Sequence, residues 1–160
     1  MHVGSHLYGA RCRWTGDTGL GWDHYDRAHD ATAPPAEPEL TLTTGEAKGD
    51  PAQLNPEQLV VMAASSCQLL SFLHVAAKAR VEVVEYEDDA EGEMPEDDPP
   101  LRLTRIVLRP RIVVREGPSE ERVRHLVEVA HNECYIANSL STEVLVEPRV
   151  EVAQPEASSP

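Results

Sequence analysis

Three cysteines are the residues of this 160-residue sequence with the most distinctive chemistry. Cys67 lies in an apolar stretch, where positions 67, 71, 74 and 78 carry Cys, Ser, His and Lys at helical spacing. This polar stripe indicates a helix face that meets solvent, a site or another subunit. A thiolate on such a face is a nucleophile, whereas a buried cysteine often serves as a small hydrophobic residue. Spacing alone leaves both interpretations open.

Other kinds of site have little support in the sequence. The seven histidines include no pair four residues apart on a predicted helix, and there is no Cys-x-x-Cys motif. His131 and Cys134 could form half of a metal site, but no second pair is evident. Glycine-rich phosphate loops and a Gly-x-Ser-x-Gly motif are absent as well. We therefore expect no metal and no bound organic cofactor.

The N-terminal third predicts a β-hairpin followed by a long connection. Two strand-like runs, 7–14 and 21–29, surround a turn rich in Gly, Asp and Thr. Alternation in the second run would place Tyr25, Arg27 and His29 on one face. The connection, 30–56, is rich in Pro, Gly and acidic residues, with strand character only at 40–43. Connections of this length tend to be functional or to cross a subunit boundary.

The remainder predicts two helices and several strands. Asn55 suits an N-cap, Pro56 the first helical position and Glu57 the first turn, and the apolar residues of 59–77 predict a largely buried helix. Ser119 is a candidate N-cap for a second helix ending near Cys134. Strands are expected at 81–86, at 101–116 with a bend at Pro110, and within 139–152. The order predicts a single α+β domain over 1–152 with a mostly antiparallel sheet, and a disordered tail at 153–160.

Charge and hydropathy restrict the partners. The formal net charge is −14, and residues 85–100 contain nine acidic and no basic side chains, which favours a solvated turn. The acid excess argues against nucleic acid or an anionic membrane as partner. Residues 1–6 do not resemble a signal peptide, and the longest apolar run, 59–64, is too short to span a bilayer. We expect a cytoplasmic protein with reduced thiols.

Two motifs resemble the OsmC/Ohr family of hydroperoxide-reducing proteins. They are Asn-Pro-Glu-Gln-Leu at 55–59, with Cys67 ten residues after its Glu, and His-Asn-Glu-Cys-Tyr-Ile-Ala-Asn-Ser-Leu at 131–140. Shorter pieces are similar to the OsmC-like branch of the family: 13–16, 25–29, 86–90 and 107–110. The resemblance covers about residues 7–148, and the order and separation of the motifs make it specific.

The resemblance implies a two-layer α/β fold in an intertwined homodimer, with active sites near the subunit interface. It also implies thiol-dependent reduction of organic hydroperoxides, followed by regeneration with an external dithiol, such as a dihydrolipoyl-type donor. Position by position, Cys67 matches the attacking thiol, Cys134 the resolving thiol, Arg27 the activating arginine, and Glu57 the carboxylate that holds this arginine. Cys12 has no counterpart, so we interpret it as structural, and His29 and His74 as packing or surface residues.

One geometric difficulty concerns Glu57. Ten helical residues separate it from Cys67 by about 15 Å, too far for one arginine to contact both. A helix break at Ser65-Ser66, with Cys67 in a new first turn, would resolve this and lower the pKa of the thiol; an unbroken helix would instead require a contribution from the other subunit. Two alternatives to the enzyme stay open: an OsmC-like binding or stress-associated protein with little turnover, and cysteines that are ordinary core residues.

Overall fold

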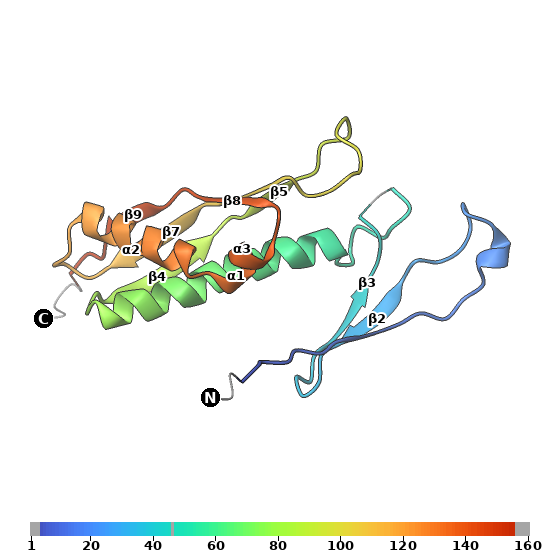
Figure 1. Cartoon of the computed structure of the whole chain (residues 1–160), viewed down its shortest axis with the longest axis horizontal. Helices are drawn as coiled ribbons and strands as arrows, with labels where there is room; N and C mark the ends of the chain where they lie inside the picture. The colour runs from blue at the N-terminus through green and yellow to red at the C-terminus, as the bar shows by residue number, and fades with distance from the viewer. Residues whose placement is uncertain (1–3, 46, 156–160) are drawn as a thin grey trace, which may run out of the picture. The chain divides into compact units, whose positions relative to one another are not determined.

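The computed structural model describes residues 4–45 and 47–155 (Figure 1). The chain divides into two compact units, Met1–Leu59 and Val60–Pro160, which we describe separately. The expectation about a signal peptide concerns residues 1–6, of which 1–3 lie outside the described part. Of the expected tail, 153–155 form no helix or strand, and 156–160 lie outside the described residues.

The first unit contains a three-stranded antiparallel sheet. Its strands are β1 (Arg11–Arg13), β2 (His29–Thr32) and β3 (Glu39–Leu42), in the order β1-β2-β3. A short 3-10 helix, η1 (Thr18–Leu20), lies within the β1–β2 connection. The expected hairpin is present, but its second strand begins only at His29. Tyr25 and Arg27 therefore lie in a loop rather than on a strand face, so that the expected alternation of Tyr25, Arg27 and His29 is wrong.

Helix α1 (Pro56–Lys78) spans the boundary between the units. A reciprocal pair of hydrogen bonds caps its start: Gln58 N donates to Asn55 Oδ1 (2.8 Å), and Asn55 N donates to Gln58 Oε1 (3.1 Å). The helix is unbroken, so the hypothesis of a break at Ser65-Ser66 is wrong. Ser65 caps no second helix, because its hydroxyl donates to the Asp88 carboxylate (2.5 Å).

The second unit is built on long, interrupted strands. Its strands are β4 (Val83–Asp88), β5 (Glu91–Glu93), β6 (Arg105–Leu108), β7 (Pro110–Val114), β8 (Glu143–Val146) and β9 (Arg149–Val152). They pair in the orders β4-β7-β9 and β5-β6-β8. Arg109 interrupts the strand expected at 101–116, one residue before Pro110. The pairs β4–β7 and β5–β6 are antiparallel, whereas β6–β8 and β7–β9 are parallel.

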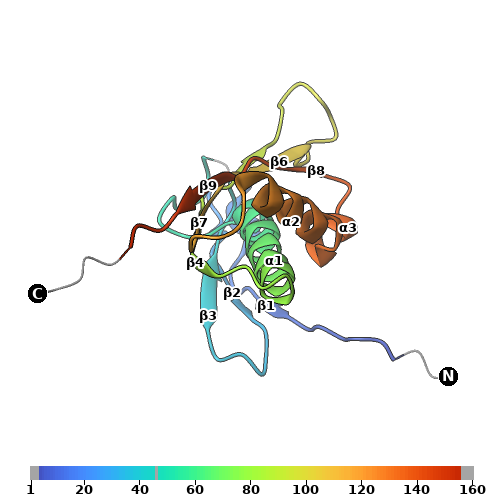
Figure 2. The same ribbon diagram turned by 90° about the vertical axis from the view of Figure 1, so that its left-hand side faces the viewer.

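Helices α1 and α2 cover one face of this sheet. Helix α2 (Glu120–Asn132) begins as expected at Ser119, whose hydroxyl accepts the Arg122 N–H (3.2 Å). Figure 2 shows α1 and α2 side by side next to β7 and β4. The core between them includes Phe72 and Val75 of α1, Ile112 of β7, and Val127 of α2. This packing of two helices on a mixed sheet agrees with the expected α+β class, and over both units four of the six strand pairs are antiparallel.

Helix α1 also carries an exposed apolar face. Met62 is 53% exposed and Leu70 is 63% exposed, and Leu73 is exposed as well. The expectation of a largely buried helix is therefore wrong for the single chain, because α2 and the sheet cover only one side of α1. Length and a mean hydropathy of 1.7 would allow α1 to cross a membrane, but core helices of soluble proteins pass the same test.

The acidic segment is more ordered than a solvated turn. Its first part forms β4 and β5, and several of its carboxylates pair with arginines of the central strands. Arg111 contacts Glu85 (2.7 Å) and Glu151 (2.9 Å), and Arg105 contacts Glu93 (2.5 Å). The prediction of a turn holds for 94–104, which form no helix or strand, and fails for 85–93, because the arginines that pair with Glu85 and Glu93 lie more than ten residues away in the sequence, on neighbouring strands.

Candidate functional site

Two of the three cysteines meet in the second unit. Cys67 lies near the middle of α1, and Cys134 lies between α2 and the short helix α3 (Tyr135–Ser139). Their side chains are close enough for Cys67 to affect the pKa of the Cys134 thiol. Cys67 is half-buried, whereas Cys134 is 1% exposed. The exposure difference gives the two thiols different access to a reactant, with Cys67 on the outside.

Burial raises the pKa of the Cys134 thiol above its usual value, and the adjacent Cys67 raises it further. The backbone N–H groups of Ala137 and Ile136, in the first turn of α3, act in the opposite direction without overcoming the effect of burial. Cys134 is therefore held as a neutral thiol near neutral pH. A neutral thiol is a poor nucleophile toward a peroxide.

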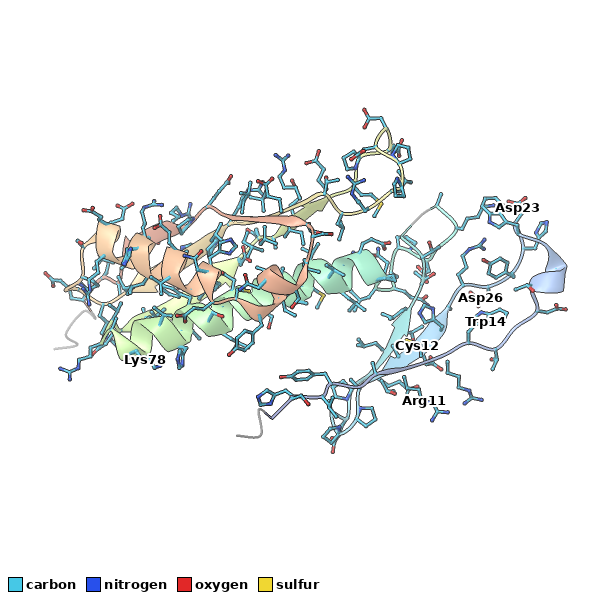
Figure 3. All side chains as sticks on the ribbon, viewed as in Figure 1. Arg11, Cys12, Trp14, Asp23, Asp26 and Lys78 are labelled. Carbon is cyan, nitrogen blue, oxygen red and sulfur yellow. The ribbon has the colours of Figure 1, made fainter. Side chains whose placement is uncertain are left out.

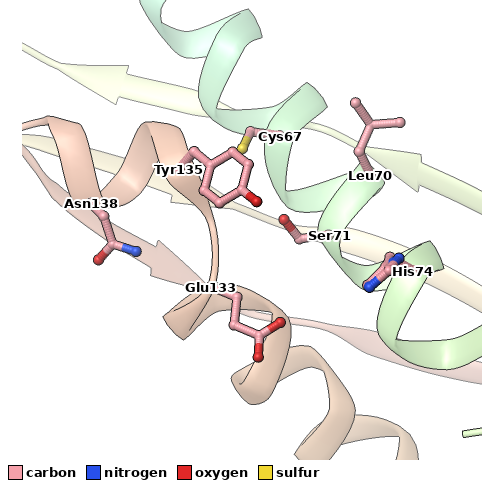
Figure 4. Close-up of a pocket in the computed structure, with 7 residues that line it drawn as sticks. All are labelled: Cys67, Leu70, Ser71, His74, Glu133, Tyr135 and Asn138. Atoms are coloured by element: carbon pink, nitrogen blue, oxygen red, sulfur yellow. The ribbon is translucent and has the colours of Figure 1, made fainter. Parts of the chain in front are cut away.

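Cys67 opens onto a pocket of about 560 Å³ (Figure 4). Helix α1, the end of α2 and helix α3 form its walls. Seven residues line it: Cys67, Leu70, Ser71, His74, Glu133, Tyr135 and Asn138. The volume is in the range that accommodates small organic ligands. A molecule in this pocket would lie against the thiol of Cys67.

The polar stripe anticipated three of the seven lining residues, and the sequence analysis did not assign the other four to a pocket. Ser71 and His74 line the pocket at the expected helical spacing from Cys67. The interpretation of His74 as a packing or surface residue is thus incomplete, because this exposed side chain also borders the pocket. Glu133, Tyr135 and Asn138 come from the end of α2 and from α3, a five-residue helix that the sequence analysis did not predict.

A second group that sequence reasoning missed lies behind the cysteines. Tyr86 of β4 packs against Phe72, with ring centroids 5.8 Å apart. Burial raises the pKa of its phenol, and the charges of Asp88 and Cys134 raise it further, so the phenol stays neutral. Gln68 is fully buried and donates through Nε2 to the Val127 carbonyl (3.3 Å). These groups tie the Cys67 segment of α1 to the sheet and to α2.

Arg27 belongs to the first unit, where it is held by its own loop. Its guanidinium donates to the carbonyls of Trp22 (2.7 Å) and Tyr25 (3.0 Å). It also stacks on the Tyr25 ring, 4.0 Å from the ring centroid. Because an arginine keeps its charge under all ordinary conditions, this loop presents a fixed cation.

Glu57 lies in the same unit without a basic partner. Among the residues that the structure describes, it forms no ion pair, and its buried Oε2 has no hydrogen-bond partner. The loop at Gly45 approaches this oxygen closely, since a Cβ at Gly45 would lie 3.2 Å from it. A buried carboxylate oxygen without a donor is costly, so Glu57 is suited to bind a cation that the described residues do not provide.

The remaining candidates, Cys12 and His29, do not line the Cys67 pocket. Cys12 is an exposed thiol on β1, opposite Ala31 of β2 (Figure 3). His29 Nδ1 lies 3.0 Å from the Arg27 carbonyl and thus takes part in local packing, as expected. Within residues 4–45 and 47–155, no three His, Cys, Asp or Glu side chains are grouped to hold a metal ion.

Comparison with known proteins identifies the family. The OsmC family model, described as OsmC-like protein, matches residues 48–149. The chain belongs to the OsmC-like family. An OsmC-like protein of unknown function from Vibrio cholerae is similar in structure, with a TM-score of 0.81, 28% identity, and coverage of 91% of this chain and 100% of that chain.

Two organic hydroperoxide resistance proteins share the OsmC-like fold. The protein from Elizabethkingia anophelis has a TM-score of 0.67 and 20% identity, covering 94% of this chain and 99% of its own. OhrB from Bacillus subtilis has a TM-score of 0.60 and 19% identity, covering 91% and 98%. The comparison with curated protein sequences gives no match. The resemblance to the OsmC/Ohr family inferred from the sequence motifs is thereby confirmed.

Proposed function

We propose that this OsmC-like protein is a thiol-dependent peroxidase that reduces organic hydroperoxides with Cys67 and Cys134. The observation that carries the proposal is the proximity of the buried Cys134 thiol to Cys67, which lines an open pocket. A binding protein needs neither cysteine, whereas a two-thiol peroxidase needs both, in contact and unequally exposed. The Elizabethkingia and Bacillus proteins are organic hydroperoxide resistance proteins, which supports the choice of hydroperoxides as substrates.

The reaction we propose has three steps. The Cys67 thiolate attacks the terminal oxygen of the hydroperoxide, the O–O bond breaks, and the alcohol leaves with a proton, so that Cys67 becomes a sulfenic acid. The Cys134 thiol then displaces the hydroxyl group as water and forms a disulfide. An external dithiol, for example of the dihydrolipoyl type, reduces this disulfide and restores both thiols.

The exposures support this division of roles. Cys67 borders the pocket, so a hydroperoxide can reach it, whereas the buried Cys134 is protected from direct oxidation. The raised pKa of Cys134 keeps it a thiol until the sulfenic acid forms beside it. Rapid capture of the sulfenic acid protects Cys67 from irreversible oxidation.

We further propose that Arg27 and Glu57 of one subunit complete the site around Cys67 of the other. The unbroken helix supports this arrangement, because about 15 Å of helix axis separates Glu57 from Cys67 within one chain. Both side chains lack a partner suited to catalysis in the single chain: Arg27 binds carbonyls of its own loop, and Glu57 Oε2 binds no described group. A guanidinium next to a thiol favours the thiolate by one to two pKa units, as a general rule.

A homodimer also fits the surface of α1. Its exposed side chains Met62, Leu70 and Leu73 form an apolar surface that is costly to leave in water. A second copy of the chain would bury this surface, and we propose the homodimer as the functional state. The proposed location of the enzyme is the cytoplasm, where thiols remain reduced.

Stopped-flow measurement of Cys67 oxidation tests the peroxidase proposal. The reduced protein is mixed with tert-butyl or cumene hydroperoxide, and the second-order rate constant is compared with that of free cysteine. A rate constant several orders of magnitude above that of free cysteine is the expected result. A rate constant equal to that of free cysteine would contradict the peroxidase and favour an OsmC-like binding protein with little turnover.

A further inference from the structure

Arg27 lies on the segment that joins β1 to β2, residues 14–28, which we call the Arg27 loop. Within this loop, the Trp14 indole donates through Nε1 to the Asp26 carbonyl at 2.8 Å (Figure 3). The Trp14 ring also meets the Tyr25 ring edge to face, with centroids 6.3 Å apart. These two contacts close the loop on itself and leave open what attaches it to the rest of the first unit.

Lys48 attaches the Arg27 loop to the connection between β3 and α1, residues 43–55. The Lys48 Nζ forms an ion pair with the Asp23 carboxylate and lies over the Trp22 ring, 4.3 Å from the ring centroid. Among the described residues, no other hydrogen bond or ion pair links the loop to this connection. Lys48 is therefore the side chain that ties the two segments together.

Trp22 transmits the position of Lys48 to Arg27. Its ring contacts both cations, because the Arg27 Cζ atom lies 5.7 Å from the same ring centroid. Its backbone carbonyl also accepts a hydrogen bond from the Arg27 guanidinium (2.7 Å). A displacement of Trp22 would therefore move a hydrogen-bond acceptor of Arg27 together with a ring that the guanidinium contacts.

The connection that carries Lys48 is folded against the start of α1. Thr43 N donates to the Leu54 carbonyl (2.9 Å), which joins the two ends of the connection. Between these ends, Gly45 lies so close to the first turn of α1 that an added Cβ would be 3.2 Å from Glu57 Oε2. A side chain anchored on this segment, as Lys48 is, therefore has a defined position relative to Glu57.

The contacts of Lys48 are also better suited to hold a loop than those of a fully exposed lysine. An exposed ion pair alone is weak, because solvent screens the charges. The Lys48 side chain is only 30% exposed, and it combines the ion pair with a cation–π contact to an indole. Among the ion pairs of the described residues, no other lies in the first unit. The one electrostatic tether described in this unit is thus at the loop that carries Arg27.

We infer that Lys48 is a positioning residue that holds Arg27 in place relative to Glu57. In the proposed homodimer, these two side chains complete the site around Cys67 of the other subunit, so both must reach that thiol together. As a general rule, a misplacement of about 1 Å in a catalytic group can cost about a hundredfold in rate. The inference rests on the proposed peroxidase function and on the role proposed for Arg27, and it adds a residue that contacts neither thiol nor substrate.

The pH dependence of Cys67 oxidation tests the inference. The rate of oxidation by cumene hydroperoxide is measured by stopped flow from about pH 5 to about pH 9. Lys48→Met and Asp23→Asn should each move the midpoint of the pH–rate profile about half a unit to higher pH, because a displaced Arg27 favours the thiolate less. At about pH 6, this shift corresponds to about a threefold lower rate.

Two further variants serve as controls. Lys48→Arg can keep the ion pair and the contact with the indole, so it should stay within about twofold of the wild-type rate. Lys78→Met removes the only other lysine of the sequence, which is exposed at the C-terminal end of α1 and forms no ion pair with a described residue (Figure 3). This variant should behave as wild type.

The Asp23 variant separates positioning from a direct effect of charge. If Lys48 acted on Cys67 only through its own charge, its loss would move the midpoint to higher pH, whereas loss of the Asp23 charge would move it to lower pH. A tether instead gives a shift to higher pH in both variants. In an Arg27→Ala background, Lys48→Met should cause no further loss, because the side chain that it positions is gone.

The outcomes keep the inference apart from the proposed function. Opposite shifts in the two variants, no shift in either, or an undiminished effect of Lys48→Met in the Arg27→Ala background would overturn the inference and leave the peroxidase intact. If wild-type Cys67 is oxidised no faster than free cysteine, the proposed function is wrong and the positioning role is wrong with it. Lys48 and Asp23 both lie at the surface, so these variants should fold as the wild type does.

Discussion

Cys134 lies buried against Cys67 at the point where α2 ends and α3 begins. The pair joins a half-buried thiol to one that burial keeps neutral, on two elements that the fold packs together. An internal disulfide requires Cα atoms within about 7 Å, which only such neighbouring segments provide. The pair therefore has the arrangement that a cycle of attack and resolution requires.

The first prediction concerns the division of labour between these thiols. In Cys134→Ser, a hydroperoxide should still oxidise Cys67 within about threefold of the wild-type rate, because access to Cys67 is unchanged. Steady-state turnover should fall about a hundredfold, because the sulfenic acid is no longer captured as a disulfide. Trapping with a sulfenic-acid reagent and mass spectrometry measures this. Cys12→Ser is the control and should behave as wild type, whereas a normal turnover of Cys134→Ser would contradict a resolving role.

The second prediction tests whether the site is shared between subunits. Cys67→Ser and Arg27→Ala should each be inactive as homodimers, with a loss of about a hundredfold or more. When the two variants are unfolded and refolded together, half of the dimers contain one of each. Each mixed dimer then holds one complete site if Arg27 acts on Cys67 of the other chain, and activity should recover to about a quarter of wild type. No recovery would mean that Arg27 and Cys67 act within one chain.

The third prediction compares the effect on stability of a substitution on the buried face of α1 with one on its exposed face. Phe72 is fully buried, so Phe72→Ala should lower the free energy of unfolding by about 3–5 kcal/mol. Leu70→Ala should change the stability of a single chain by about 0.5 kcal/mol or less, because this side chain is exposed. If α1 meets a second chain, the effect of Leu70→Ala should depend on protein concentration. Denaturant titrations at two protein concentrations, with sedimentation analysis, measure both effects.

The fourth prediction concerns the acid stability of the sheet. The hydrogen bond from Arg111, together with the charges of Arg111 and Arg149, holds the pKa of Glu151 below its usual value. A carboxyl with a lowered pKa in the folded state stabilises the fold above its unfolded pKa, about 4.3, and loses this contribution as the pH falls through the folded value. Glu151→Gln should therefore be less stable than wild type at pH 6–7, and the difference should shrink below about pH 4. Thermal unfolding across this range checks it, and a difference that grows in acid would contradict the ion pair.

Much of the fold follows from local signals in the sequence. The Asn55 and Ser119 caps mark the start of both long helices because their side-chain oxygens accept free N–H groups of the first turn. The bend near Pro110 is present because proline cannot continue the hydrogen-bonding of a central strand. The fold class and the family also follow from motif order, and the match to residues 48–149 bears this out.

The errors arise where partners are distant in sequence or a segment is short. The 25–29 alternation suggested a strand, but Arg27 binds carbonyls of its own loop instead, a contact that periodicity does not reveal. Tyr135 and Asn138 could not be assigned to the pocket because a helix as short as α3 leaves no periodic pattern. The helix break at Ser65-Ser66 was wrong because Ser65 bonds to Asp88, over twenty residues away.

The most direct test of the account is a thiol count after oxidation. The reduced protein, which has three cysteines, is treated with one equivalent of cumene hydroperoxide under exclusion of air, and free thiols are counted and located by peptide mass mapping. We predict a fall from three thiols to one, with a Cys67–Cys134 disulfide and a free Cys12. Three intact thiols, or a loss confined to the exposed Cys12, would contradict the proposed peroxidase.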